Sequence, residues 1–238
     1  MRWLQGLVLS LLMIASVAFA QQISFRIMSR SLIEDFGEPP LGAARSAAAR
    51  PLIRLALDVI KDFEGWVDVA YDDPAGYCTI GYGHLISLKR CNEVDLAAVD
   101  AGKYSSKLSE SSGLDLLEKD TVTARLAIQS LVSVDLTDEQ FGALTSFVFN
   151  IGKENFKRST MLRLLNAGEF DFAGRQFSRW IRAGEVIPPG LVARRACEET
   201  LFRHQLAYGR DGRFNRGDCV SLGAAPSAGS LIDIEKGE

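Results

Sequence analysis

The chain has 238 residues, of which 47% are hydrophobic, and it carries a formal net charge of −3 at pH 7. This length allows one large domain or two small ones, and the hydrophobic content is sufficient for a buried core. The sequence has no basic tract and no interleaving of basic and aromatic residues, which argues against nucleic acid as a partner. We therefore expect a soluble globular protein, active as a monomer.

The first twenty residues are typical of an export signal. Arg2 precedes an apolar run over residues 4–19, which ends in the small-x-small pattern of a cleavage site. The run is too short for a stable membrane span, although a retained anchor is the alternative. We expect a signal peptide over residues 1–20, a linker over 21–50, and an exported protein that is periplasmic or secreted.

Apolar residues then recur at helical spacing and end at a glutamate. The spacing predicts a helix in which Glu64 occupies the last turn and Gly65 ends the helix. The negative end of the helix dipole disfavours an ionised carboxyl, and so do apolar neighbours such as Phe63 and Trp66. A carboxyl that keeps its proton near neutral pH can serve as a general acid.

The stretch from Asp72 to Gly76 predicts a turn at the tip of a hairpin. We expect this turn to be wet and rich in backbone donors, so that Asp73 stays ionised. Two carboxyl groups in contrasting environments form the usual pair of a glycoside hydrolase.

The following strand, residues 77–82, places Tyr77, Thr79 and Gly81 on one face. A hydroxyl beside Asp73 can hold a water molecule for attack from the face opposite the acid. This arrangement predicts inversion, with the two carboxyl groups about 6.5–9.5 Å apart.

The rest of the chain reads mainly as helix. Residues 87–113 are polar and give no clear prediction, whereas residues 114–134 predict one long helix. Thr137 and Gln140 form a capping box for a helix that ends near Gly152. Shorter signals predict three further helices and a terminal loop with a flexible tail: residues 159–166, a helix capped by Asp171 that carries Phe177 and Trp180, residues 190–208, and the tail at 209–238.

These motifs resemble the phage-type (T4-like) lysozymes, glycoside hydrolase family 24. The resemblance rests on the spacing of Glu64, Asp73 and Thr79, with eight residues between the first two and five between the last two. Ile-Gly-Tyr-Gly-His follows the threonine. It covers residues 51–208 and extends, in the same order, to segments that resemble the family's C-terminal lobe: 136–144, 147–152, 159–162, 177–180 and 190–195. It implies an α+β fold, in which a small β-hairpin lobe is joined by a long helix to a larger all-helical lobe.

The resemblance also implies an activity, that of a muramidase. Such an enzyme hydrolyses the β-1,4 bond between N-acetylmuramic acid and N-acetylglucosamine in peptidoglycan, with inversion and without a cofactor. Glu64 would be the acid, and Asp73 and Thr79 would manage the water; the family spacing selects Asp73 over Asp68 and Asp72. The alternatives are a lytic transglycosylase and a noncatalytic peptidoglycan-binding component of an envelope machine, against which the intact triad argues.

Supporting residues are expected around this triad. In the family an arginine reaches the catalytic glutamate; Arg194 and Arg195 are the candidates here, and we favour Arg194. Its charge would favour the ionised form of Glu64. Tyr82 and Asn150 could contact the sugar or could simply support the fold.

Four cysteines are consistent with an oxidising compartment. The simplest of the three possible pairings joins Cys78 to Cys91 and Cys197 to Cys219. The sequence has no CxxC pair and no second histidine near His84, so we expect no metal site. The position of His84 after Gly-Tyr-Gly fits a hydrogen-bonded structural histidine.

Overall fold

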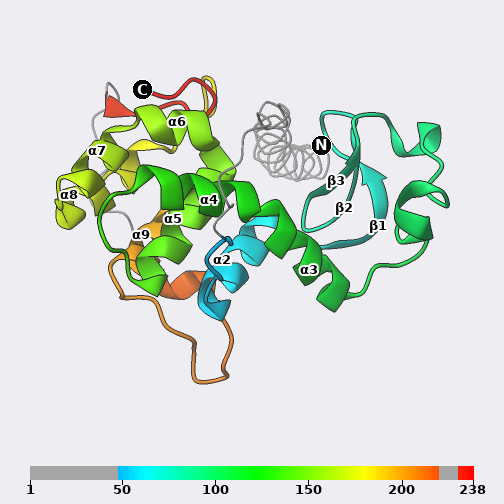
Figure 1. The fold of residues 1–238 in the computed structure, drawn as a ribbon, viewed down its shortest axis with the longest axis horizontal. Coiled ribbons are helices and arrows are strands. Elements are labelled where there is room, and N and C mark those ends of the chain that lie inside the picture. Colours follow the sequence, from blue (N-terminus) through cyan, green and yellow to red (C-terminus); the bar gives the residue numbers. More distant parts are fainter. Residues whose placement is uncertain (1–47, 220–229) are drawn as a thin grey trace, which may run out of the picture.

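A computed structural model describes residues 48–219 and 230–238, which form two lobes (Figure 1). The expected signal peptide and nearly all of the expected linker lie outside the described residues. The small lobe contains a three-stranded antiparallel sheet, and the larger lobe is helical. Within the described ranges, no helix has the length and apolar character that a membrane crossing requires.

Helix α2 (Arg54–Glu64) begins the described fold and ends at the predicted position. Gly65 ends the helix because its φ of 75° is left-handed, a conformation that side chains other than glycine rarely tolerate. The helix packs into the core of the helical lobe through Val59 and Ile60, which are fully buried. It thereby delivers Glu64 from the helical lobe towards the sheet.

The sheet has the strand order β1-β2-β3 and consists of β1 (Val67–Asp72), β2 (Cys78–Gly81) and β3 (His84–Ser87). The hairpin predicted around residues 73–77 is confirmed, and Tyr71 pairs with Thr79 across it. The third strand was not predicted. The region without a sequence prediction contains two short 3-10 helices, η1 (Cys91–Glu93) and η2 (Val99–Gly102).

The single long helix expected over residues 114–134 is wrong in detail. The structure has α3 (Glu110–Asp120), capped by Ser109, and α4 (Val122–Leu131), with Thr121 between them. At the break, the hydroxyl of Thr121 and the guanidinium of Arg125 both donate to the carbonyl of Glu118. That carbonyl would otherwise accept the next helical hydrogen bond, so the side chains compete with the helix there.

The helical lobe surrounds α5 (Asp138–Ile151), whose predicted capping box between Thr137 and Gln140 is present. The buried side chains of α5 contact the helices around it, and Phe147 meets Phe177 and Trp180 edge-on at 5.1 and 5.5 Å between ring centroids. The remaining elements of the lobe are α6 (Lys153–Arg158), α7 (Thr160–Asn166), α8 (Phe170–Gly174), η3 (Phe177–Arg179), α9 (Pro189–Phe202) and η4 (Arg216–Asp218).

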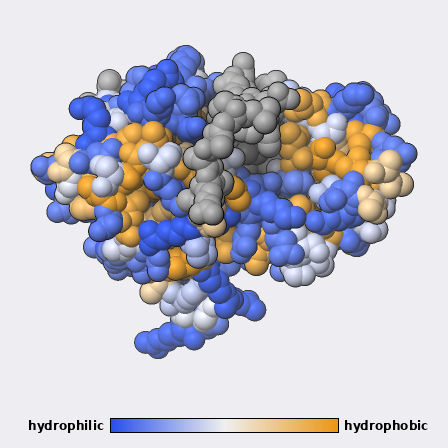
Figure 2. Space-filling view, in the orientation of Figure 1, coloured by the Kyte–Doolittle hydropathy of each residue, from blue (hydrophilic) through white to orange (hydrophobic). Residues whose placement is uncertain are grey.

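Several helix boundaries differ from the prediction. Helix α8 ends at Gly174, so Phe177 lies in the separate helix η3 and Trp180 follows it. Asp171 does not cap α8 but lies in its first turn, where it pairs with Arg203 at 3.2 Å. Helix α9 ends at Phe202 and not near residue 208, although apolar spacing continues because Leu206 is also buried. The loop that follows α9, orange in Figure 1, projects from the helical lobe and has a largely hydrophilic surface in Figure 2.

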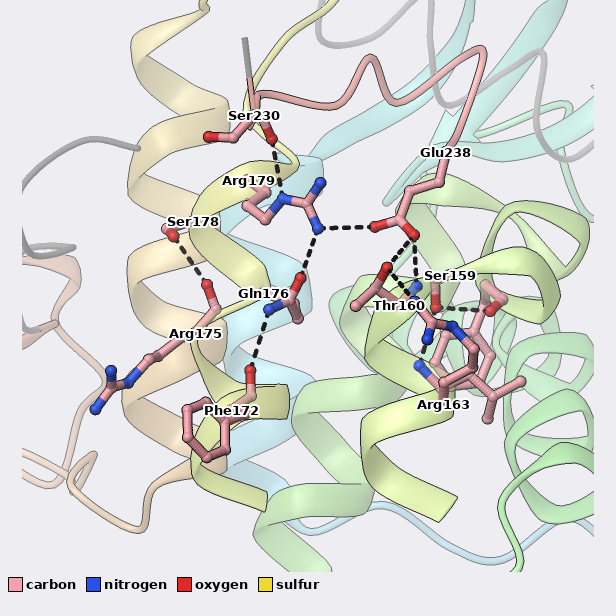
Figure 3. Close-up of polar contacts among 12 residues, drawn as sticks. Ser159, Thr160, Arg163, Phe172, Arg175, Gln176, Ser178, Arg179, Ser230 and Glu238 are labelled. Carbon is pink, nitrogen blue, oxygen red and sulfur yellow. Dashed lines mark hydrogen bonds and ion pairs between the residues drawn. The ribbon is translucent and has the colours of Figure 1, made fainter. Parts of the chain in front are cut away.

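The expectation of a flexible C-terminal tail is wrong for residues 230–238. Ile232 and Ile234 are buried in the core, and Asp233 forms a parallel bridge with Arg182. Figure 3 shows the carboxylate of Glu238 between Thr160 and Arg179, whose guanidinium donates to it at 3.1 Å. The final segment is therefore part of the packed helical lobe.

The buried position of Ile234 gives a stability prediction. Ile234→Ala should lower the free energy of unfolding by about 2–5 kcal/mol, because it removes buried methyl groups and leaves a cavity. Urea unfolding followed by circular dichroism measures this change. The exposed neighbour Glu235, changed to alanine, is the control and should stay within about 0.5 kcal/mol of the parent. Equal stability of both variants would contradict the packed position of the segment.

Candidate active site

Glu64 lies at the junction between α2 and the sheet with its side chain fully buried. Its Oε1 accepts a hydrogen bond from Nη1 of Arg194 at 2.8 Å. No donor within residues 48–219 and 230–238 reaches its Oε2. The two oxygens therefore differ, since one is held by a guanidinium and the other is available to carry a proton.

The environment raises the pKa of Glu64. Burial is the largest cause and outweighs Arg194, which acts to lower the pKa; the nearby carboxylates Glu198 and Asp120 add to the rise. Of the effects expected from the sequence, desolvation and an opposing arginine are both present, and desolvation dominates.

This raised pKa predicts how stability changes with pH. Glu64 holds its proton more tightly in the folded chain than in the unfolded chain. Its contribution to folding stability is therefore complete below the ordinary pKa of 4.5, and it is lost as pH rises through the folded pKa. Glu64→Gln has no such loss. We expect its Tm to exceed that of the parent at pH 7, and the difference to shrink towards pH 4. A calorimetric pH series in which the difference does not grow with pH would contradict this.

Arg194, and not Arg195, reaches Glu64, as the sequence favoured. The guanidinium of Arg195 points the other way, donating to the carbonyl of Trp180 at 2.9 Å and to Asn150 and Glu198. Asn150 is itself buried, so its position fits support of Arg195 and does not fit contact with a sugar.

Asp73 occupies the turn predicted for it. Its Oδ1 accepts hydrogen bonds from the backbone N–H groups of Ala75 and Tyr77, each at 2.8 Å. The turn itself is exposed at Pro74 and Ala75, as predicted, but the expectation is wrong for Asp73, which is only 5% exposed. Backbone donors of the tight turn, and not bulk water, therefore solvate this carboxylate.

Thr79 is buried on β2 and its hydroxyl donates weakly to the carbonyl of Tyr77 at 3.3 Å. Its partner across the ladder, Tyr71, was missed by the sequence analysis. Burial, then Asp73, then Glu64 raise the pKa of Tyr71 well above its usual range. Asp73 and Glu64 therefore both act on the phenol of Tyr71.

Both predicted disulfides are present. Cys78 is bonded to Cys91, which ties β2 to the loop after β3, and Cys197 is bonded to Cys219, which ties α9 to the loop after it. Asp72 accepts a hydrogen bond from the backbone of Cys91 at 2.6 Å, so this competing carboxylate braces the disulfide loop.

The remaining candidates have structural contacts. Nδ1 of His84 lies 2.9 Å from Asp120, and its Nε2 lies 3.2 Å from the hydroxyl of Tyr104, which fits the structural role expected of this histidine. Tyr82 is buried and packs against Trp66 with ring centroids 4.8 Å apart. Its packing favours the supporting role over contact with a sugar.

Comparisons with known proteins cover the same region. Over 148 residues the chain is 38% identical to an endolysin of Bacillus phage B103, which corresponds to 61% of this chain and 51% of that protein. The chain thus spans about half the length of that relative. It is also 34% identical over 135 residues to a SAR-endolysin of Bacteriophage PS119, which covers 55% of this chain and 71% of that protein.

A solved structure of a P22 lysozyme mutant superposes with a TM-score of 0.55 at 33% identity, covering 65% of this chain and 99% of that one. This similarity agrees with the small sheet and helical majority seen here, so the α+β, lysozyme-like two-lobed fold is confirmed. The phage lysozyme family model matches residues 61–198, more than half of the chain and all of the candidate site from Glu64 to Arg194. The chain belongs to the phage lysozyme family.

Proposed function

We propose that this protein is an endolysin-type muramidase of glycoside hydrolase family 24, in the lysozyme class. The observation that carries the proposal is Glu64, a buried carboxyl with a raised pKa, one oxygen on Arg194 and the other without a donor in the described chain. Asp73 and Thr79 lie on the adjoining hairpin. A relative described as an endolysin supports the same activity.

In the proposed reaction, Oε2 of Glu64 gives its proton to the glycosidic oxygen as the bond from that oxygen to the anomeric carbon breaks. A water held by the hydroxyl of Thr79 and by Asp73 attacks the anomeric carbon from the opposite face. Its released proton passes to Asp73 and then to solvent, and a later proton from solvent restores Glu64. The anomeric configuration inverts, since no covalent glycosyl-enzyme intermediate forms.

Product analysis on purified peptidoglycan tests this proposal. Digestion in ¹⁸O-labelled water should give reducing N-acetylmuramic acid ends that carry one labelled oxygen, detected by mass spectrometry. Early products should have the α configuration by NMR, because an inverting reaction converts the β configuration at the anomeric carbon into α. Anhydro ends without label would instead identify a lytic transglycosylase, and binding without cleavage would identify a noncatalytic glycan-binding protein.

We also propose that the enzyme acts outside the cytoplasm, as an exported monomer without a cofactor. Residues 1–20 would be the signal, 21–50 the linker and 51–208 the catalytic domain. Two disulfides support an oxidising compartment, and a SAR-endolysin among the relatives is consistent with periplasmic action. Expression with and without residues 1–20 tests this: lysis should require the signal when both forms are produced at equal levels.

A further inference from the structure

The guanidinium of Arg194 is enclosed by three acceptor groups. Its Nη1 donates to Glu64 at 2.8 Å, its Nε donates to Oε1 of Glu198 at 3.0 Å, and its Nη2 donates to the carbonyl of Ser146 at 3.1 Å. Every nitrogen of the group is therefore used. Arg194 cannot turn relative to Glu64 without breaking its bonds to the other two residues.

Glu198 is the acceptor that Arg194, Arg195 and Ser146 share. It lies one turn after Arg194 on α9 with its side chain fully buried, and its Oε1 accepts a further hydrogen bond from the hydroxyl of Ser146 at 2.7 Å. Its Oε2 accepts from Nη1 of Arg195 at 2.7 Å, and Arg195 is held in turn by the carbonyl of Trp180. The proposed mechanism gives Glu198 no contact with the substrate, yet it is a charge buried beside the acid.

We propose that Glu198 is a positioning residue for the general acid. It holds Arg194 against Glu64 and neutralises part of the positive charge of Arg194, so that Glu64 can keep a proton. The inference rests on the proposed function of Glu64 as the acid. Two guanidinium groups and the carboxylate of Glu198 carry one net positive charge when Glu64 is protonated. Without the charge of Glu198 they would carry two, and the ionised form of Glu64 would be strongly favoured.

The other groups that face Glu64 do not replace this contribution. Asp120, on α3, also raises the pKa of Glu64, but its effect is smaller than that of Glu198 and it is paired with His84. Tyr71, on β1, is a neutral phenol whose pKa is raised by burial, by Asp73 and by Glu64. Burial itself also raises the pKa of Glu64, and the charge of Glu198 adds to that rise and offsets part of the lowering by Arg194.

Glu198→Gln tests the inference because it removes the charge and nearly preserves the shape. The acid must be protonated to act, so kcat/KM falls as pH rises through the pKa of Glu64. In the variant this alkaline limb should move to lower pH by about one unit. Glu199→Gln is the matched control, since Glu199 is the next residue on α9 and pairs with Arg203. Its limb should not move, and an unmoved limb in folded Glu198→Gln would overturn the inference.

Glu198→Asp keeps the charge but shortens the side chain, and it carries the test if the glutamine variant does not fold. We expect kcat to fall about 10- to 100-fold with little change in KM, because Arg194 and Glu64 are less firmly held. The alkaline limb should stay near that of the parent. Parental kcat in the folded aspartate variant would overturn the positioning role.

A measurement that does not depend on turnover separates this inference from the proposed function. The titration of Glu64, followed by carboxyl ¹³C NMR, should move to lower pH in Glu198→Gln. If the parent releases no reducing ends, the proposed function fails, while the NMR titration still decides whether Glu198 controls the proton. If the parent is active and the titration does not move, only the inference about Glu198 fails.

Discussion

Glu64→Gln is expected to lower kcat on purified peptidoglycan about 10²- to 10⁴-fold, to the limit of detection in a turbidity assay. Glutamine can still accept the hydrogen bond from Arg194, so the local structure should be retained. It cannot give a proton to the leaving oxygen, however, and the sugar oxygen would have to leave as an alkoxide. Release of reducing ends, measured by mass spectrometry, gives the residual rate directly.

The control for this variant is Asp68→Asn. Asp68 is a carboxylate on strand β1, next to the end of α2, but it is partly exposed and pairs with Lys107 at 2.8 Å. Its replacement should leave kcat within about twofold of the parent, since an exposed ion pair contributes little to stability. Parental activity in Glu64→Gln, or an equal loss in both variants, would contradict the role of Glu64.

Thr79→Ala is expected to have the second-largest effect, a loss of about 10²-fold in kcat with a smaller change in KM. The hydroxyl of Thr79 has only a weak contact with the carbonyl of Tyr77, so its oxygen can accept a hydrogen bond from the attacking water. Alanine removes this group, and the water is then placed by Asp73 alone. Initial rates over a range of peptidoglycan concentrations separate kcat from KM.

Thr79→Ser is the matched variant, because it loses the methyl group and keeps the hydroxyl. Thr79 is 2% exposed, so both substitutions leave a small void and both should lower stability. Only the alanine variant should lose most of its activity. An equal loss in the serine variant would assign the effect to packing and would contradict a role in holding water.

The sequence predicted best those features that depend on neighbouring residues. Gly65 ends the first helix because its backbone adopts a left-handed conformation, and Thr137 caps α5 because its hydroxyl reaches the third residue of the helix. The turn before β2 placed Asp73 and Thr79 for the same reason. In each case the deciding contact lies within a few positions along the chain.

Features that depend on distant contacts could not be predicted in this way. Glu198 resembles an ordinary helical glutamate until folding places it against Ser146, 52 positions away. Ile232 and Ile234 look like part of a tail because their partners belong to a lobe formed much earlier in the chain. The dry setting of Asp73 and the proximity of Tyr71 to both carboxylates likewise require the assembled lobes.

The pairing of Tyr71 with Thr79 limits how the hairpin can vary. Side chains alternate along a strand, so a shift of one position would turn the threonine hydroxyl towards the opposite surface. Insertions or deletions of a single amino acid between the two strands should therefore inactivate the protein, even where many substitutions at the same positions are tolerated.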